Sequence, residues 1–236
     1  MAPIGIISGT VLHGANVFRG LRKEHVVNEF GRVTVWVSRQ IAHISRHDRD
    51  PADYVLPHLI NHQANLAALK NLGIQDVVAI NSTGSLKKDL PPGSIVVPDD
   101  FILLADTPTV FTNQPVHITP DLSCEVRRRL IEAAGACGIS VVERGIYWQT
   151  EGPRLETKAE IRMMAPFADI VGMTMAAEAI VAKELGLSYA ALCSVDNYCN
   201  GVVETPLTME MIIEGAKKNR ETMMTIVSTF IERSQA

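Results

Sequence analysis

The chain has 236 residues, of which 47% are hydrophobic and 20% charged, and its formal net charge is −4. This balance is typical of one folded globular domain, here over residues 1–236, and excludes a disordered chain. The sequence has no basic stripe, no apolar run of about 18 residues and no signal-peptide pattern, so we expect a cytoplasmic protein that binds neither nucleic acid nor membrane.

Predicted strands and helices alternate along the chain, because runs rich in Val and Ile are followed by segments with apolar residues at helical spacing. In chain order, the predicted elements are strands at residues 4–7, 33–37 and 41–44, a helix at 63–72, a strand at 77–80, helices at 122–136 and from about 157, a strand at 170–173, a helix at 176–185, a strand at 189–195 and a helix at 208–233. This alternation predicts an α/β fold with a mixed, largely parallel central sheet flanked by helices.

Polar residues at the ends of three predicted strands are candidates for an anion site, because ligands of α/β folds gather at the carboxyl ends of strands. The turn at residues 8–10 offers backbone N–H groups and the Thr10 hydroxyl. Arg46 with His47 follows the next strand, and Ser82 follows a third. Each feature is also compatible with an ordinary turn or a solvated pair, and the sequence does not show that the three converge.

The segment Glu151-Gly152-Pro153-Arg154-Leu155-Glu156-Thr157 is the strongest local motif, and its Gly-Pro step predicts a turn before a helix. Glu156 has two interpretations: a carboxylate stabilised by the dipole of a helix N-terminus, or an acceptor for an N–H group of a heterocyclic base. Asn197 follows a predicted buried strand, where it is either a turn residue or a side chain that both donates to and accepts from a ligand.

The ordered set of motifs resembles the trimeric purine nucleoside phosphorylase and methylthioadenosine phosphorylase family over nearly the full length of the chain. The stretches that carry the resemblance are Gly5-Ile6-Ile7-Ser8-Gly9-Thr10, Arg46-His47, Asn61-His62-Gln63-Ala64-Asn65, Gly84-Ser85-Leu86, Glu151-Gly152-Pro153-Arg154 and Val171-Gly172-Met173-Thr174. The resemblance implies a homotrimer, or a dimer of trimers, that binds a nucleoside with inorganic phosphate as co-substrate and uses no metal or other cofactor.

The resemblance also implies roles for individual residues. These are Thr10, Arg46, His47 and Ser82 for phosphate, Met173 for the ribose, Thr174 for the substrate, Leu155, Glu156 and Asn197 for the base, and His117 for a neighbouring subunit's site. As the glycosidic bond breaks, Asn197, helped by Asp196, would stabilise the negative charge that develops on the purine.

Glu156 and Asn197 favour a 6-oxopurine over adenine. A 6-oxopurine carries a hydrogen on N1, which suits an ionised and acceptor-only Glu156, whereas adenine presents a lone pair there. Such a buried mismatch costs a few kcal/mol, about 1–3 per unsatisfied group. Asp196 leaves the adenine interpretation open, because a carboxylate can accept from an exocyclic amine.

Met209, Ile212 and Ile213 fall on one face of the last predicted helix, where similar enzymes that act on ordinary nucleosides often place a His. This face is either plain core packing or an apolar pocket for a 5′-methylthio group, which suits the adaptable side chain of Met.

Several positions depart from the family pattern. Ser8 and Val11 stand where the family has Gly, Asp48 follows Arg46-His47 where Gly is usual, and His62 replaces a Tyr. These changes lie near the expected phosphate and ribose, so three alternatives stay open: a methylthioadenosine phosphorylase, a nucleosidase that uses water, and a non-catalytic nucleoside-binding or scaffolding protein.

Overall fold

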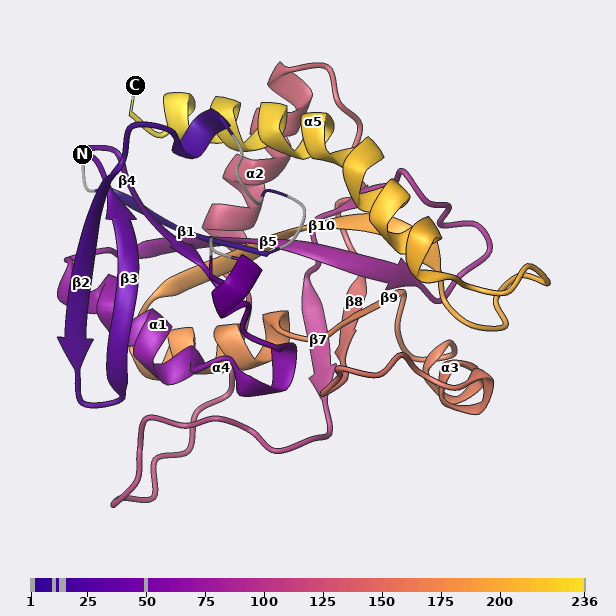
Figure 1. Ribbon diagram of the computed structural model, residues 1–236, viewed down its shortest axis with the longest axis horizontal. Helices are drawn as coiled ribbons and strands as arrows, with labels where there is room; N and C mark the ends of the chain where they lie inside the picture. Colours follow the sequence, from indigo (N-terminus) through magenta and orange to yellow (C-terminus); the bar gives the residue numbers. More distant parts are fainter. Residues whose placement is uncertain (1–2, 10–11, 13–15, 49–50, 236) are drawn as a thin grey trace.

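The chain folds around a central sheet that has helices on both faces (Figure 1). The computed structural model describes residues 3–9, 12, 16–48 and 51–235. Its strands are β1 (Ile4–Ser8), β2 (Arg22–Asn28), β3 (Gly31–Val37), β4 (Ile41–Ser45), β5 (Asp76–Ser85), β6 (Ile95–Val96), β7 (Asp100–Leu103), β8 (Ile146–Gln149), β9 (Ile170–Gly172) and β10 (Ser188–Tyr198). Its α-helices are α1 (His62–Asn71), α2 (Cys124–Ala136), α3 (Lys158–Met164), α4 (Met175–Glu184) and α5 (Met209–Arg233).

The sheet is mixed and largely parallel, which confirms the predicted fold class. The strand order along its main path is β2-β3-β4-β1-β5-β9-β8-β7. Strand β10 branches from this path, because it pairs with β5 and also with β6. The ladders β1–β4, β1–β5, β5–β10, β7–β8 and β8–β9 are parallel. Antiparallel pairing joins β2–β3, β3–β4, β5–β9 and β6–β10. Within the described part of the chain, no helix is long and apolar enough to cross a membrane.

Polar side chains cap the helices where the sequence changes from strand to helix. Asn61 and Ser123 accept hydrogen bonds from the first turns of α1 and α2. Thr157 and Glu160 form a capping box at the start of α3, so each side chain satisfies a backbone N–H that the helix itself leaves unpaired. The Thr208 side chain accepts a hydrogen bond from the first turn of α5. These caps set the helix starts within a few residues of the predicted ones.

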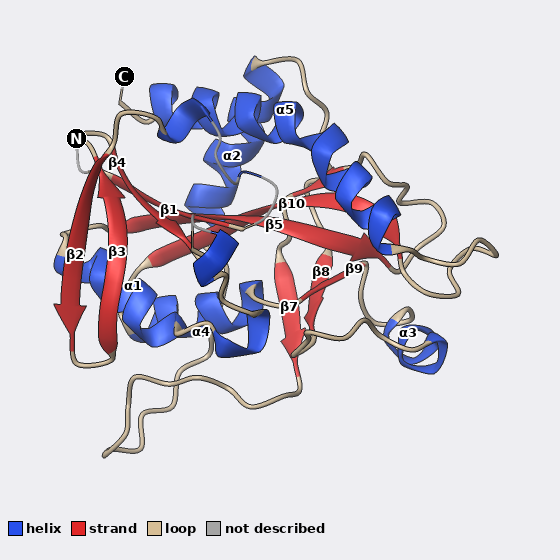
Figure 2. Cartoon of the chain, viewed as in Figure 1, coloured by secondary structure: helices blue, strands red, loops and turns tan. Residues whose placement is uncertain are grey.

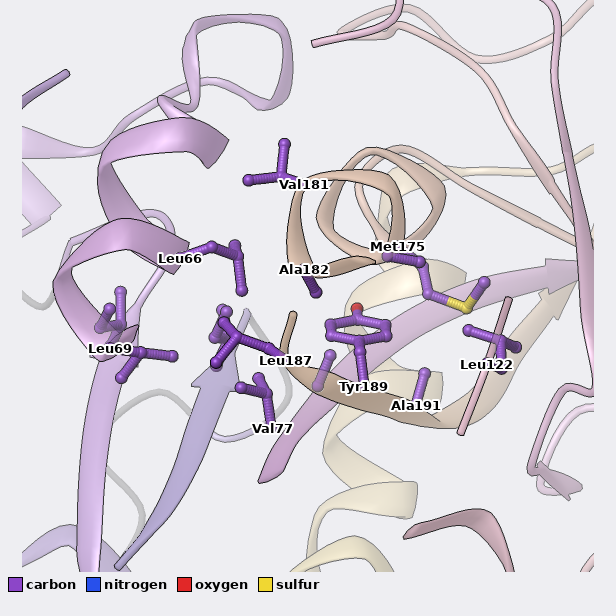
Figure 3. Close-up of a cluster of buried hydrophobic side chains, with 14 of the residues drawn as sticks. Leu66, Leu69, Val77, Leu122, Met175, Val181, Ala182, Leu187, Tyr189 and Ala191 are labelled. Atoms are coloured by element: carbon purple, nitrogen blue, oxygen red, sulfur yellow. The ribbon is translucent and has the colours of Figure 1, made fainter. Parts of the chain in front are cut away.

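Two apolar cores lie on opposite faces of the sheet. Helices α1 and α4 cover one face, while α2 and α5 cover the other (Figure 2). The first core includes Leu66, Leu187 and Tyr189, with the Tyr189 ring packed beneath α4 (Figure 3). The second includes Leu130 and Phe230, which join α2 to α5. Burial of each such side chain stabilises the folded state by about 1.5–3 kcal/mol. The packing on both faces therefore keeps the strand ends in fixed positions.

Two strands run further than predicted. The strand predicted at residues 77–80 continues to Ser85, because β10 pairs with β5 along its whole length. Strand β10 reaches Tyr198 and contains an irregularity between Val195 and Asn197, so Asp196 has no direct partner on β5. Strands β2, β6, β7 and β8 were not predicted, because they are short or carry few apolar residues.

Candidate active site

A cavity of about 330 Å³ opens beside a stretch of β5 that has a paired strand on one side only. On one side of β5, the β1 ladder ends at Ile80 and the β9 ladder begins at Gly84. In the described residues, no strand pairs with that side of Asn81, Ser82 and Thr83. Their polar groups therefore face a gap in the sheet, which is the kind of place where α/β folds bind ligands. The volume lies within the usual range for small-molecule sites.

Most of the predicted site residues line this cavity. They are Arg46, His47, Ser82, Leu155, Glu156, Met173, Thr174, Asn197, Met209 and Ile212. Two do not: Asp196 lies behind the wall, and His117 is exposed on the loop between β7 and α2, which extends away from the sheet (Figure 1). Thr10 falls outside the described residues. Residues that the sequence did not single out also line it, among them Tyr54, Leu56 and Leu207.

A buried ion pair holds Arg46 at the cavity. Its Nε and Nη2 donate to the two oxygens of Glu178 at 2.7 and 3.0 Å, and Nη1 donates to the Ile80 carbonyl at 2.8 Å. Glu178, which also accepts from the Tyr189 hydroxyl at 2.7 Å, is only 1% exposed. The guanidinium has five N–H donors, so two can still reach a ligand anion. Apolar periodicity gave no sign of Glu178, because its buried position lies among the apolar residues of the first part of α4.

His47 is a neutral side chain with a defined tautomer. Its Nδ1 donates to the Val55 carbonyl at 2.7 Å, since a carbonyl oxygen can only accept. Burial lowers the pKa of His47 to about 4, and the nearby Arg46 acts in the same direction. At neutral pH the ring therefore carries its proton on Nδ1, and Nε2 presents a lone pair. The ring also stacks on Tyr54, at 4.9 Å between centroids.

Asn81 and Thr174 form a polar pair in the cavity wall. Asn81 Nδ2 donates to Thr174 Oγ1 at 3.0 Å, which leaves the Thr174 hydroxyl proton available to a ligand. Asn81 is 2% exposed, and its Oδ1 has no hydrogen-bond partner among the described residues. Thr174 also precedes α4, whose first N–H groups donate to the Tyr147 hydroxyl and to Gln149. The Thr174 hydroxyl is therefore the group of this pair that can donate to a ligand.

Ser82 faces the cavity but is tied to Asp196 behind it. The Ser82 hydroxyl donates to one oxygen of Asp196, and Asn219 of α5 donates to the other at 2.7 Å. This position does not support the expected role of Asp196 beside Asn197. The irregularity in β10 directs the carboxylate toward α5 and away from the base end of the cavity.

Glu156 and Asn197 lie at the other end of the cavity. Glu156 is 7% exposed, and its Oε1 accepts from Thr150 Oγ1 at 2.6 Å. A carboxylate has a second oxygen, so Oε2 can still accept from a ligand. Asn197 Nδ2 donates to the Tyr198 carbonyl at 3.0 Å and has a second hydrogen to offer. Cys199 lines the same end with a buried thiol, and burial raises its pKa well above the usual value.

Apolar side chains surround the middle and the mouth of the cavity. Met173 packs against the backbone of Gly152, where an added Cβ would lie 2.5 Å from the Met173 sulfur. Leu207 comes from the segment just before α5, and Met209 and Ile212 come from the start of that helix. Met209 is 61% exposed, which places it at an open rim and not in the packed core. The alternative of plain core packing therefore does not describe Met209.

Three departures from the family pattern have defined surroundings in the fold, and the fourth, Val11, falls outside the described residues. Ser8 Oγ lies 2.8 Å from His43 Nε2, so its side chain is directed into the fold and not into the cavity. Asp48 adopts a left-handed backbone with φ of 64°, a conformation that favours Gly. His62 is buried at the start of α1, with Nδ1 3.9 Å from Glu178.

The fold and the cavity define an α/β enzyme whose site has a buried Arg-His pair at one end and a buried Glu-Asn pair at the other. The chain belongs to the phosphorylase superfamily, whose family model matches residues 3–232. Among curated relatives, it is 37% identical to a probable 6-oxopurine nucleoside phosphorylase of Archaeoglobus fulgidus. The match covers 98% of this chain and 96% of that relative. It is 34% identical, over 97% of its length and 91% of the relative's, to a probable S-methyl-5′-thioinosine phosphorylase of Methanocaldococcus jannaschii.

Solved structures agree with this family. The methylthioadenosine phosphorylase of Schistosoma mansoni in complex with adenine superposes with a TM-score of 0.87 at 26% identity, covering 100% of this chain and 92% of that one. The resemblance stated from the motifs is thereby confirmed at the level of family and fold.

Proposed function

We propose that the protein cleaves the N-glycosidic bond of a purine nucleoside with inorganic phosphate and releases the base and a ribose 1-phosphate. The observation that carries this proposal is a single cavity wall with Arg46 and His47 at one end and Glu156 and Asn197 at the other. The relatives named as nucleoside phosphorylases support the same reaction.

Phosphate would bind at the end that holds Arg46. The guanidinium supplies the positive charge, while Thr174 and the backbone of β5 next to the gap in the sheet supply neutral donors. The Thr10 hydroxyl is proposed to add a further donor, as the family resemblance implies. The neutral His47 presents a lone pair, so it would accept from the protonated oxygen of hydrogen phosphate.

The base would lie between Glu156 and Asn197, with Leu155 against its face and Met173 under the ribose. As the glycosidic bond lengthens, the ribose becomes positively charged and the purine negatively charged. Asn197 donates toward N7 or O6 and stabilises that negative charge. Bound phosphate then attacks the anomeric carbon, and holding both reactants in place contributes on the order of 7–11 kcal/mol.

We propose a 6-oxopurine as the preferred base. Thr150 donates to Oε1 of Glu156, so Oε2 of the carboxylate is free to accept N1–H. Adenine would place a lone pair against that oxygen. The A. fulgidus and M. jannaschii relatives carry names of the 6-oxopurine and thioinosine types, which agrees with this choice.

Adenine nucleosides are the second candidate. A relative in Pyrococcus furiosus at 34% identity is named S-methyl-5′-thioadenosine phosphorylase, and the superposed S. mansoni enzyme holds adenine. At the 5′ end of either substrate, Leu207, Met209 and Ile212 favour an apolar methylthio group.

We further propose a homotrimer, or a dimer of trimers, that works in the cytoplasm without a metal. The exposed His117 does not line its own cavity, so we place it at a neighbour's site. Light scattering that shows a fully active monomer would contradict this assembly.

The deciding experiment measures kcat/KM on inosine, guanosine, adenosine and their 5′-methylthio forms, with and without phosphate. We expect strict phosphate dependence and a preference for 6-oxopurines. A site built around a hydrogen bond can reject an analogue that lacks it by up to about 10⁴-fold. Glu156→Gln should lower activity on inosine-type substrates far more than on adenosine-type ones. Arg46→Ala should raise the phosphate KM sharply, and unchanged phosphate kinetics would remove Arg46 from the site.

A further inference from the structure

Asp196 is a buried carboxylate directly behind the proposed phosphate end of the cavity. It is 3% exposed and sits at the irregularity of β10, where it has no direct ladder partner on β5. One oxygen accepts from the Ser82 hydroxyl, and the other accepts from Asn219 at 2.7 Å. Ser82 lines the cavity and Asp196 does not, so Ser82 lies between the carboxylate and any bound anion.

The direction of the Ser82 hydrogen bond depends on whether Asp196 carries a proton. A serine hydroxyl has one hydrogen. When Asp196 is ionised, it can only accept, so it takes that hydrogen, and Ser82 presents lone pairs to the cavity. When Asp196 is protonated, its O–H can donate to Ser82, and the Ser82 hydrogen is then free to point at a ligand oxygen.

Electrostatics acts in the same direction as this hydrogen-bond switch. An ionised carboxylate behind Ser82 repels a phosphate anion, and in a poorly solvated interior that repulsion is weakly screened. Protonation of Asp196 removes the repulsion and adds a donor at the same moment. Both effects make the protonated form the better partner for phosphate.

The groups around Asp196 do little to hold it ionised. From β5 it meets Ser82, from α5 it meets Asn219, and its own strand contributes Ser194 and the buried thiol Cys193. In the part of the chain that is described, no Lys, Arg or His pairs with it. Burial raises the pKa of the Asp196 carboxyl above its usual value, although the hydrogen bonds from its neighbours act in the opposite direction.

We propose that Asp196 is a positioning residue which couples phosphate binding to the uptake of a proton, by deciding whether Ser82 donates to or repels the anion. This inference rests on the proposed phosphate-binding function of the cavity. It predicts that phosphate binds more tightly as the pH falls, by up to tenfold per pH unit for a single linked proton.

The test is isothermal titration of the full chain with inorganic phosphate, over a pH series and in buffers of different ionisation enthalpy. Phosphate itself gains or loses a proton near neutral pH. The readout is therefore the difference in proton uptake on phosphate binding between the parent and its variants. Asp196→Asn keeps an acceptor for Asn219 and supplies a permanent N–H donor to Ser82. We expect the Asp196→Asn variant to take up fewer protons than the parent when phosphate binds. At alkaline pH it should bind phosphate at least as tightly as the parent does at acidic pH.

Two further variants make the result specific. Ser82→Ala changes the fold little and removes the switching hydroxyl, so it should weaken phosphate binding at acidic pH and change it little at alkaline pH. Asp106→Asn makes the same chemical change at an exposed loop position and should match the parent throughout. A melting curve for each variant establishes that it is folded.

The outcomes separate the two proposals. If the parent binds no phosphate and cleaves no nucleoside with it, the proposed function fails. If the parent binds phosphate but Asp196→Asn shows the same proton uptake and pH slope, or loses binding at every pH while folded, the role of Asp196 is overturned and the function stands.

Discussion

Replacement of Glu178 by Gln should lower the free energy of unfolding more than any other single change at the site, because it leaves the buried charge of Arg46 without a partner. Arg46 is 4% exposed and Glu178 is 1% exposed. Two of the three hydrogen bonds from the guanidinium end on the Glu178 carboxylate. Removing one member of a buried ion pair costs about 3–5 kcal/mol. For a chain of this size, about 1 kcal/mol shifts Tm by roughly 2–4 °C, so Tm should fall by roughly 6–20 °C.

Thermal unfolding and phosphate kinetics together test this prediction. The phosphate KM should rise as well, since Gln offers one acceptor where Arg46 needs two. The control is the double variant Arg46→Met/Glu178→Gln, which removes both charges but keeps an acceptor for Tyr189. It should recover most of the stability without recovering phosphorolysis. A Glu178→Gln protein that melts with the parent and has the same phosphate KM would refute the view that this ion pair holds Arg46 in place.

Three further predictions concern the backbone, the 5′ pocket and pH. Gly215→Ala should destabilise the fold by about 1–3 kcal/mol or more, because the new Cβ would clash with the Asp196 carbonyl oxygen; an unchanged urea midpoint would show that α5 can shift freely. Met209→Lys should lower kcat/KM for 5′-methylthio substrates, since an ammonium is costly against an apolar group, but it should leave Tm unchanged, since Met209 is 61% exposed; equal activity on methylthioinosine would remove this helix face from the site. Burial lowers the pKa of His62 from 6.5 to about 4, so the unfolded chain binds more protons in that window and stability should fall as the pH drops through it. His62→Gln should flatten this dependence, and an equally steep loss in the variant would assign it to other groups.

Local sequence information predicted the elements of the fold well. The helix starts follow from caps such as Asn61, Ser123 and Thr157, because a cap and the turn it satisfies lie within a few residues of each other. Apolar runs predicted the buried strands of the centre of the sheet, where both faces are covered. The short strands β6 and β8 were missed, since their pairing partners and not their own composition make them strands.

The residues at the two ends of the cavity were also predictable, because motif order placed Arg46, His47, Glu156 and Asn197 at strand ends or turns. That they line one cavity was not, since it depends on the register of strands far apart in the chain. The cavity exists because, on the same side of β5, the β1 ladder ends at Ile80 and the β9 ladder begins at Gly84.

The sequence by itself determined the α/β class, the helix boundaries and most of the residue types at the site, because these depend on periodicity, capping and local motifs. Only the tertiary structure decided what those residues do. In the sequence, Glu178 is one polar residue in an apolar stretch, and only the fold places it on Arg46, 132 positions away. Asp196 reads as a neighbour of Asn197 until the irregularity of β10 directs it to Ser82 and Asn219. In both cases a hydrogen bond between distant elements sets the chemistry, and no local pattern records such a bond.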